Sequence, residues 1–357
     1  MTTPPRPTGL DRRRFLRGGV LLGGAVLLAG TACGRNGADS QAEPGPTGAT
    51  GDTGAATGDA AQVSYQGEAA ITHLTAIVHS APFHIAQALG YYEEEGLTLE
   101  HISFPGGSDT IRGMESGIPL GSPASLPLFI AYEKGLDQLR IIGSVYNAAS
   151  VDFIAPADSP INSVEDLEGA KIAVSTPGSN STYFAERTVQ EAGFTPGQDV
   201  ELINVGGPGD AWTAASQGVV DVAWTASPLP ERLVEEGAAK VVWRSRDFVE
   251  HWTDTVLATT QDFIDSDPDV LRAWVRAVQR AMDLINSDPE AAAEPYAEAV
   301  DISAAVAVAA LQSAPAGTFT TELDMDGLEE NVKAGLDEGQ LTAEPDMSAI
   351  VVDEFLA

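Results

Sequence analysis

The chain has 357 residues, 43% of them hydrophobic, which is enough to bury the core of one large domain or two smaller ones. Its 52 acidic and 19 basic residues leave a formal net charge of -33. A surface dominated by carboxylates repels nucleic acid phosphates and anionic lipid headgroups, which argues against both as partners. The only cysteine, Cys33, excludes an intrachain disulfide and a cysteine-based metal cluster.

Residues 1–32 have the pattern of an export signal. Arg12 and Arg13 open a positively charged segment, which is followed by an uncharged, apolar stretch from Gly18 to Ala32. That stretch is too short to span a membrane stably, and the paired arginines resemble the twin-arginine export signal. We therefore expect the protein to be exported already folded.

Cys33 directly follows the apolar stretch, behind the small residues Thr31 and Ala32, in an arrangement that resembles a lipoprotein cleavage site. In such proteins the cysteine becomes the mature N-terminus and carries the lipid. We expect Cys33 to anchor the protein on the outer face of the cytoplasmic membrane, at the cell surface or in the periplasm. The alternative is a stray cysteine behind a conventional cleavage site. Residues 33–68 are rich in Gly, Ala, Thr and Asp, which predicts a flexible tether.

From Ala69 onward, short apolar runs alternate with helical patterns, which predicts an α/β fold. Strands are expected at residues 71–78, 97–104, 139–145, 152–155, 171–175, 200–205 and 219–225. Helices are expected at residues 82–92, 109–116 and 182–192. After Asp267 the chain turns helical, with Pro268 in the first turn and one apolar face made of Val270, Trp274, Val278, Ala281, Met282 and Ile285.

Two segments about one hundred residues apart resemble each other. In each, a Gly-Gly pair and an aspartate open a helix that ends at a glycine eight residues beyond the aspartate, at Asp109–Gly117 and Asp210–Gly218. An apolar strand and a Ser-Pro dipeptide then follow, at Ser122 and at Ser227. The repetition predicts two lobes that are built alike.

Several short segments, taken together and in order, carry a family resemblance: Ala81–Ala86 with Leu89–Tyr92, Ser159–Ile161 with Asp166–Val174, Gly218–Asp221, and Asp267–Pro268 with Ser287–Ala291. They resemble the substrate-binding proteins of the nitrate/sulfonate/taurine ABC importers, a family that also includes binders of a thiamine pyrimidine precursor. The resemblance implies an α/β fold of two Rossmann-like lobes, joined by a two-strand hinge, with the ligand cleft between them. By analogy, lobe 1 comprises residues 69–158 and 255–357, and lobe 2 comprises residues 159–254.

The resemblance also implies a function. It indicates an exported receptor, a monomer without cofactor, that captures a small molecule and delivers it to an ABC permease and its ATPase. A sulfonate- or nitrate-type anion and a pyrimidine-like ring both remain open as ligands. Two alternatives are an enzyme of the same fold, of the thiamine-pyrimidine synthase or menaquinone-pathway type, and a ligand sensor without transport. The enzyme fits less well, because export is indicated and the synthase carries a cysteine-rich segment that is missing here.

In open α/β sheets, ligands bind beyond the carboxyl ends of the strands. Applied to lobe 1, this rule selects as ligand-binding candidates His79, Ser80, Phe83, Gly107, Ser108, Ser122, Ser125, Tyr146 and Asn147. Applied to lobe 2, it selects Thr176, Gly178, Ser179, Asn180, Ser181, Trp212, Trp224 and Ser227.

Some of these candidates have a structural alternative. The loop 176–182 at a helix start is a potential anion site, but ordinary helix capping explains the same residue types. Trp212 and Trp224 are candidates for stacking on a planar ligand, with core packing as the alternative. No arginine falls in these loops, which disfavours a carboxylate or phosphate held bidentately. The five histidines are too scattered to predict a metal site.

Overall fold

Two five-stranded sheets organise the computed structural model, which describes residues 63–74, 77–175 and 179–356. The first sheet has the order β2-β1-β3-β10-β4 and is formed by β1 (Tyr65–Thr72), β2 (Leu97–Phe104), β3 (Leu120–Ser122), β4 (Leu139–Tyr146) and β10 (Thr255–Thr260). The second has the order β7-β6-β8-β5-β9 and is formed by β5 (Val151–Pro156), β6 (Lys171–Val174), β7 (Glu201–Asn204), β8 (Val222–Ala226) and β9 (Ala239–Arg244).

The two sheets share one topology. In the first, β1 pairs in parallel with β2 and β3, and β10 runs antiparallel between β3 and β4. In the second, β6 pairs in parallel with β7 and β8, and β5 runs antiparallel between β8 and β9. The prediction of two α/β lobes that are built alike is therefore confirmed.

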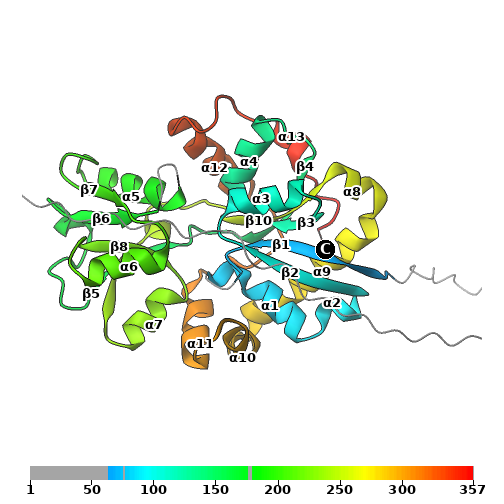
Figure 1. Cartoon of the computed structure of the whole chain (residues 1–357), viewed down its shortest axis with the longest axis horizontal. Helices are drawn as coiled ribbons and strands as arrows, with labels where there is room; N and C mark the ends of the chain where they lie inside the picture. Colours follow the sequence, from blue (N-terminus) through cyan, green and yellow to red (C-terminus); the bar gives the residue numbers. More distant parts are fainter. Residues whose placement is uncertain (1–62, 75–76, 176–178, 357) are drawn as a thin grey trace, which may run out of the picture. The chain divides into compact units, whose positions relative to one another are not determined.

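Helices cover both faces of the first sheet (Figure 1). One face carries α1 (Ala81–Ala88), α2 (Tyr91–Glu94), α9 (Pro268–Ser287), α10 (Pro289–Val300) and α11 (Ala304–Ser313). The other carries α3 (Gly107–Glu115), α4 (Ser125–Glu133) and α12 (Met325–Asp337). Short elements complete this lobe: η1 (Val78–Ser80), α8 (Gln261–Ser266) and α13 (Met347–Ile350). All six residues of the expected apolar face of α9 are buried, and Pro268 begins that helix, as predicted.

The second sheet has a core of its own. Its helices are α5 (Asn180–Glu191), α6 (Pro208–Ser216) and α7 (Leu229–Glu235), with the short turns η2 (Val164–Asp166) and η3 (Ser245–Asp247). Side chains from the strands and from the helices beside them, including Phe153, Phe184 and Trp243, form one apolar cluster. The rings of Phe153 and Trp243 stack with their centroids 4.4 Å apart, which fastens β5 to β9.

The chain passes twice between the sheets, at residues 147–150 and 248–254. The two passages meet where the backbone N–H of Asp254 donates to the carbonyl of Tyr146 at 2.8 Å. The expected boundary after residue 158 is wrong, because β5 lies between β8 and β9 and so belongs to the second lobe. The tether was expected to include residues up to 68, but its expected end lies too late in the sequence, because β1 pairs with β2 from Tyr65 onward.

The export-signal residues Arg12 and Arg13, the lipidation candidate Cys33 and the tether up to residue 62 lie outside the described residues. Among the helices that the structure describes, none is both long and apolar enough to cross a membrane.

Candidate ligand-binding site

The side chain of Asp254 joins residues of both lobes near the second passage. Its Oδ2 lies 3.2 Å from Nδ1 of His79 and accepts a hydrogen bond from Oγ of Ser150 at 3.0 Å. Its Oδ1 accepts from the Nδ2 amide of Asn180, in the second lobe, at 3.1 Å. Since only 5% of the Asp254 side chain is exposed, these partners replace water around its charge.

The backbone of Asp254 extends the same network. Its carbonyl accepts from the N–H of Ser125, at the start of α4, at 3.1 Å, and its N–H reaches Tyr146. Four sequence candidates, His79, Ser125, Tyr146 and Asn180, are thus brought together around a residue that sequence reasoning missed. The second ring nitrogen of His79 lies 3.2 Å from the carbonyl of Thr72. Both ring nitrogens of His79 therefore lie within hydrogen-bonding distance of an oxygen atom.

Three buried hydroxyls in the same part of the first lobe have no hydrogen-bond partner within the stretches that the structure describes. Ser122 ends β3 beside Ile71 of β1, and Ser125 and Thr255 lie next to Asp254. The Oγ atoms of Ser122 and Ser125 and the Oγ1 atom of Thr255 have no hydrogen-bond partner among the described residues. An unpaired buried hydroxyl costs about 1–3 kcal/mol.

A second polar cluster lies at the start of β5. Asp152, with 1% of its side chain exposed, lies 3.1 Å from Nη1 of Arg246 and 3.8 Å from Nε of Arg244. Burial raises the pKa of Asp152 to about 7, although Arg246 lowers it. Thr225 of β8 pairs with Asp152 in the sheet, and its buried Oγ1 has no partner in the described part of the chain.

The Asp152 cluster also reaches the first lobe. Arg246 donates from Nη2 to the carbonyl of Ser313, at the end of α11, at 2.9 Å. The hydroxyl of Ser227 lies 3.0 Å from that of Ser313 and donates to Glu231 at 2.7 Å. The carbonyl of Ser227 accepts from the N–H of Val78 at 2.7 Å. Ser227, a ligand-binding candidate from lobe 2, thus contacts two residues of the first lobe.

Beside these links, a pocket of about 370 Å³ opens between the lobes, under α7 and α11. Its walls are mostly apolar, and Arg244 and Glu231 are among its polar lining residues. No arginine falls in the candidate loops chosen from the sequence, and Arg244 lies outside them. Those loops were chosen from a set of expected strands that did not contain β9, and Arg244 stands at the carboxyl end of that strand.

The serine side chains at the start of α5 form local hydrogen bonds that are typical of a helix cap. Oγ of Ser179 accepts from the backbone N–H of Thr182, and Oγ of Ser181 accepts from that of Ser175 at 2.9 Å. These hydroxyls therefore satisfy backbone donors within the lobe. Thr176 and Gly178, from the same loop, lie outside the described residues.

Three further lobe 1 candidates pack or form hydrogen bonds within the first lobe and its neighbouring passages. Phe83 is fully buried in the core of the first lobe, where its ring stacks on Trp274. Ser80 donates from Oγ to the carbonyl of Ile77 at 2.8 Å. Asn147 donates from Nδ2 to the carbonyl of Glu322 at 3.0 Å and accepts from Thr253 through Oδ1 at 3.1 Å.

The glycine-rich turn before α3 contributes packing. A Cβ at Gly107 would lie 3.0 Å from the side chains of Ala124 and Pro127, so α3 and α4 approach closely there. Ser108, the next residue, lies on the same turn and makes no contact with the Asp254 or Asp152 networks among the described residues.

The two tryptophans pack in the second lobe. Trp224 is 7% exposed, and its Nε1 donates to the carbonyl of Gly206 at 3.0 Å. Trp212 is half-buried against the same apolar cluster. The packing alternative therefore accounts for Trp224, while Trp212 keeps a partly open face.

The residues that sequence reasoning missed are polar groups in the two passages between the lobes or in the elements next to them: Asp254, Ser150, Asp152, Arg244 and Arg246. One pattern points to Asp152, because it is a single carboxylate inside the apolar run 151–155. A charge at such a position is buried only when it is paired. Nothing local distinguishes Asp254 from the many other aspartates.

The sequence of the chain matches a protein family and two individual relatives. A family model described as NMT1/THI5 like matches residues 78–292, which is more than half of the chain. The riboflavin-binding protein RibY of Chloroflexus aurantiacus is 24% identical over 278 residues, 76% of this chain and 75% of that protein. A putative aliphatic sulfonates-binding protein of Escherichia coli K12 is 30% identical over 148 residues, 40% of this chain and 44% of that protein.

The fold itself recurs among solved structures. The alkanesulfonate-binding protein SsuA from Xanthomonas axonopodis pv. citri, bound to MOPS, superposes with a TM-score of 0.68 at 17% identity, covering 82% of this chain and all of that one. Two alike lobes and two passages between them define the protein as a two-lobed α/β protein of the periplasmic binding protein fold. The chain belongs to the NMT1/THI5-like family.

Proposed function

We propose that the protein is an extracytoplasmic solute receptor, which captures a small molecule between its lobes and delivers it to an ABC permease and its ATPase. The observation that carries this proposal is the group of buried, unpartnered hydroxyls of Ser122, Ser125, Thr225 and Thr255 among the described residues. They come from both lobes and lie at strand ends and beside the passages between the lobes. A polar molecule held there satisfies donors that the folded chain leaves unpaired.

Within that class, the ligand we propose is a neutral planar ring of the pyrimidine or flavin type. The basic side chains nearest the passages already have acidic partners, His79 with Asp254 and Arg246 with Asp152. A sulfonate or nitrate would have to compete with these carboxylates for positive charge. A ring with both donors and acceptors fits hydroxyls and a carboxylate without adding net charge. The match to a riboflavin-binding relative over three quarters of both chains supports this choice.

Binding without chemical conversion is the simplest use of this site. Both curated relatives are named as binding proteins. The chain has one cysteine, Cys33, for which we propose lipidation and no chemical step. The contacts of Asn180 with Asp254 and of Arg246 with Ser313 hold the lobes together and have to yield when a ligand enters.

Ligand capture is testable by thermal unfolding of the purified protein with riboflavin, hydroxymethylpyrimidine, taurine, an alkanesulfonate and nitrate. A ring ligand at one hundred times its Kd should stabilise the fold by about 2.7 kcal/mol, while the anions leave it unchanged. Stabilisation by a sulfonate or nitrate alone would overturn the ring proposal and keep the receptor. No stabilisation by any member of these classes would contradict the receptor function.

A single substitution tests whether the ligand binds at the proposed site. Ser122→Ala should weaken ligand binding roughly five- to a hundredfold, because one ligand atom loses its partner. The same change should leave the unliganded protein equally stable or slightly more stable, since it removes an unpaired buried hydroxyl. Ser266→Ala, at the exposed end of α8, is the control and should change neither quantity.

We further propose that Cys33 carries a lipid and that Arg12 and Arg13 direct export, as their pattern predicts. Cys33→Ala should move the protein from the membrane fraction into the soluble exported fraction, because the acyl chains supply the membrane affinity. Replacing Arg12 and Arg13 together by lysine should retain the precursor inside the cell. Unchanged membrane association of Cys33→Ala, or normal export of the double-lysine variant, would contradict the respective assignment.

A further inference from the structure

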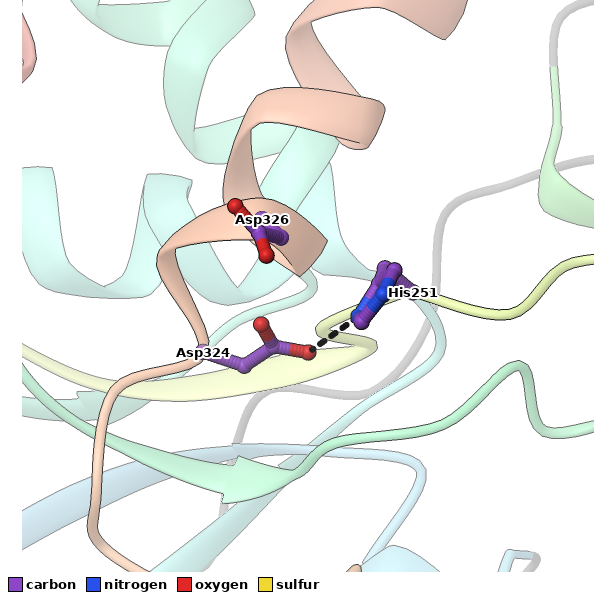
Figure 2. Close-up of side chains that lie close together, drawn as sticks. All are labelled: His251, Asp324 and Asp326. Atoms are coloured by element: carbon purple, nitrogen blue, oxygen red, sulfur yellow. Dashed lines mark ion pairs between the residues drawn. The ribbon is translucent and has the colours of Figure 1, made fainter.

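A histidine and two aspartates from distant parts of the chain converge beside the second passage. Figure 2 shows His251 next to the first turn of α12, with Asp324 and Asp326 on that turn. Nδ1 of His251 lies 3.8 Å from Oδ2 of Asp324, and one potential ligand atom from each of the three residues lies within 4.8 Å of the others. None of the three takes part in the interlobe network around Asp254 or Asp152.

The backbone on both sides of this group is held in place by buried contacts. Thr253 donates to the carbonyl of Asp324 at 3.3 Å. The fully buried Asn331 donates to the carbonyls of Thr253 and Gly327 at 3.0 and 2.8 Å. A Cβ at Gly327 would lie 2.8 Å from the nitrogen of Thr253, so only glycine permits this approach. The second passage is therefore held directly against α12.

The carboxylate of Asp324 is oriented by the same helix. Its Oδ1 accepts from the N–H of Gly327 at 3.0 Å as the N-cap of α12, which turns Oδ2 toward His251. The side chain of His251 is half exposed and that of Asp324 is 27% exposed, so solvent reaches the group. The positions of the main chain are thus fixed, while the side-chain tips remain free to adjust.

One imidazole nitrogen and two carboxylate oxygens are a ligand set for a transition metal ion. Zinc–ligand bonds of ~2.0–2.2 Å in a tetrahedral site place the ligand atoms ~3.4 Å from each other. A shift of the exposed side-chain tips by roughly 1.5 Å brings the present atoms into that range. The nitrogen ligand favours Zn²⁺, Co²⁺ or Ni²⁺ over Ca²⁺ and Mg²⁺, which prefer oxygen alone. Two carboxylates also match the charge of a divalent ion, and the net charge of -33 attracts cations to the surface.

We propose that His251, Asp324 and Asp326 bind a divalent transition metal ion of the Zn²⁺ class, which fastens the second passage, residues 248–254, to α12. Water completes the coordination on the exposed side. Because His251 belongs to the passage and the aspartates to the first lobe, the ion stabilises the junction on which lobe movement depends. The site is separate from the ligand-binding site and does not depend on the ligand proposed there.

The experiment is a titration of the purified, tag-free and metal-stripped protein with ZnCl₂ and CoCl₂ at pH 7.5. We expect one ion per chain by calorimetry, a cobalt absorption band in the visible region, and a higher melting temperature with metal. His251→Ala and Asp326→Asn should each weaken binding by roughly tenfold or more. Both positions are exposed, so the metal-free variants should have the same melting temperature as the metal-free wild type.

Asp262→Asn is the matched control, because Asp262 is an exposed aspartate in the first turn of another helix, α8. It should bind zinc as the wild type does. Binding that is weak, exceeds one ion per chain and survives His251→Ala would show only adsorption to surface carboxylates and would overturn the proposal. Absence of binding to the wild type, or equal competition by millimolar Mg²⁺, would overturn it as well.

Discussion

Asp254→Ala should lower the free energy of unfolding by about 3–5 kcal/mol, the loss expected when a buried group that holds several buried polar partners is removed. The side chain accepts from Ser150 and Asn180 and contacts His79. Alanine leaves these three polar groups buried without their acceptor. Since Asn180 belongs to the second lobe, part of the loss should appear as weaker association of the lobes.

Urea unfolding of wild type, Asp254→Ala and Asp254→Asn measures this effect. The asparagine keeps the shape and one acceptor oxygen, so its loss should be smaller than that of alanine. Asp137→Ala is the control, because Asp137 is exposed, and it should stay within about 0.5 kcal/mol of the wild type. A loss below about 1 kcal/mol for Asp254→Ala would mean that the network does not stabilise the fold.

Arg246→Met should destabilise the protein by about 3–5 kcal/mol at pH 8, and by clearly less at pH 5. The change removes the guanidinium that lies 3.1 Å from the buried Asp152 and that also reaches Ser313. At pH 8 the buried carboxyl group of Asp152 must either stay ionised without this partner or take up a proton, and both cost free energy. At pH 5 Asp152 takes up a proton in the folded state and the cost falls, because burial already raises its pKa to about 7.

The sign of the pH effect follows from that pKa. A carboxyl group whose pKa is higher in the folded than in the unfolded protein contributes stability that is fully present below its ordinary pKa, which is 3.8 for an aspartate. This contribution is lost as the pH rises through about 7. The variant should therefore show a steeper loss of stability than the wild type between pH 5 and pH 8.

Two comparisons make the Arg246 result interpretable. Adding Asp152→Asn to Arg246→Met should remove most of the difference between pH 5 and pH 8, because no buried carboxylate remains at this position. Arg272→Met removes an exposed arginine that pairs with Asp269, and it should cost at most about 1 kcal/mol at either pH. A pH-independent loss for Arg246→Met would show that Asp152 is not the group involved.

Local pattern was sufficient for several of the helices, although α4 and α7 were not expected. The repeat of apolar residues from Val270 to Ile285, with Pro268 before it, predicted α9, and every residue of that face is buried. The two glycine-aspartate segments likewise predicted α3 and α6 and the likeness of the lobes. Such features depend on neighbours within a few residues, which the linear sequence contains.

The choice of site residues was only partly predictable. The rule that ligands lie beyond strand ends selected His79, Ser125 and Asn180, which the structure joins through Asp254. The same rule selected Phe83, which packs in the core, because the direction of a side chain follows from strand register and helix rotation. Arg246 was overlooked because β9 was not expected as a strand.

By itself, the sequence determined the α/β class, the doubled topology, the family resemblance and the polar loops near the cleft, since each rests on periodicity or on short motifs. Only the tertiary structure decided which lobe owns β5 and which aspartates lie between the lobes. Asp254 meets His79 across 175 positions of the chain, and Arg246 meets Asp152 across 94. Contacts at such separations are set by strand order and by the pairing of buried charges, neither of which leaves a local pattern.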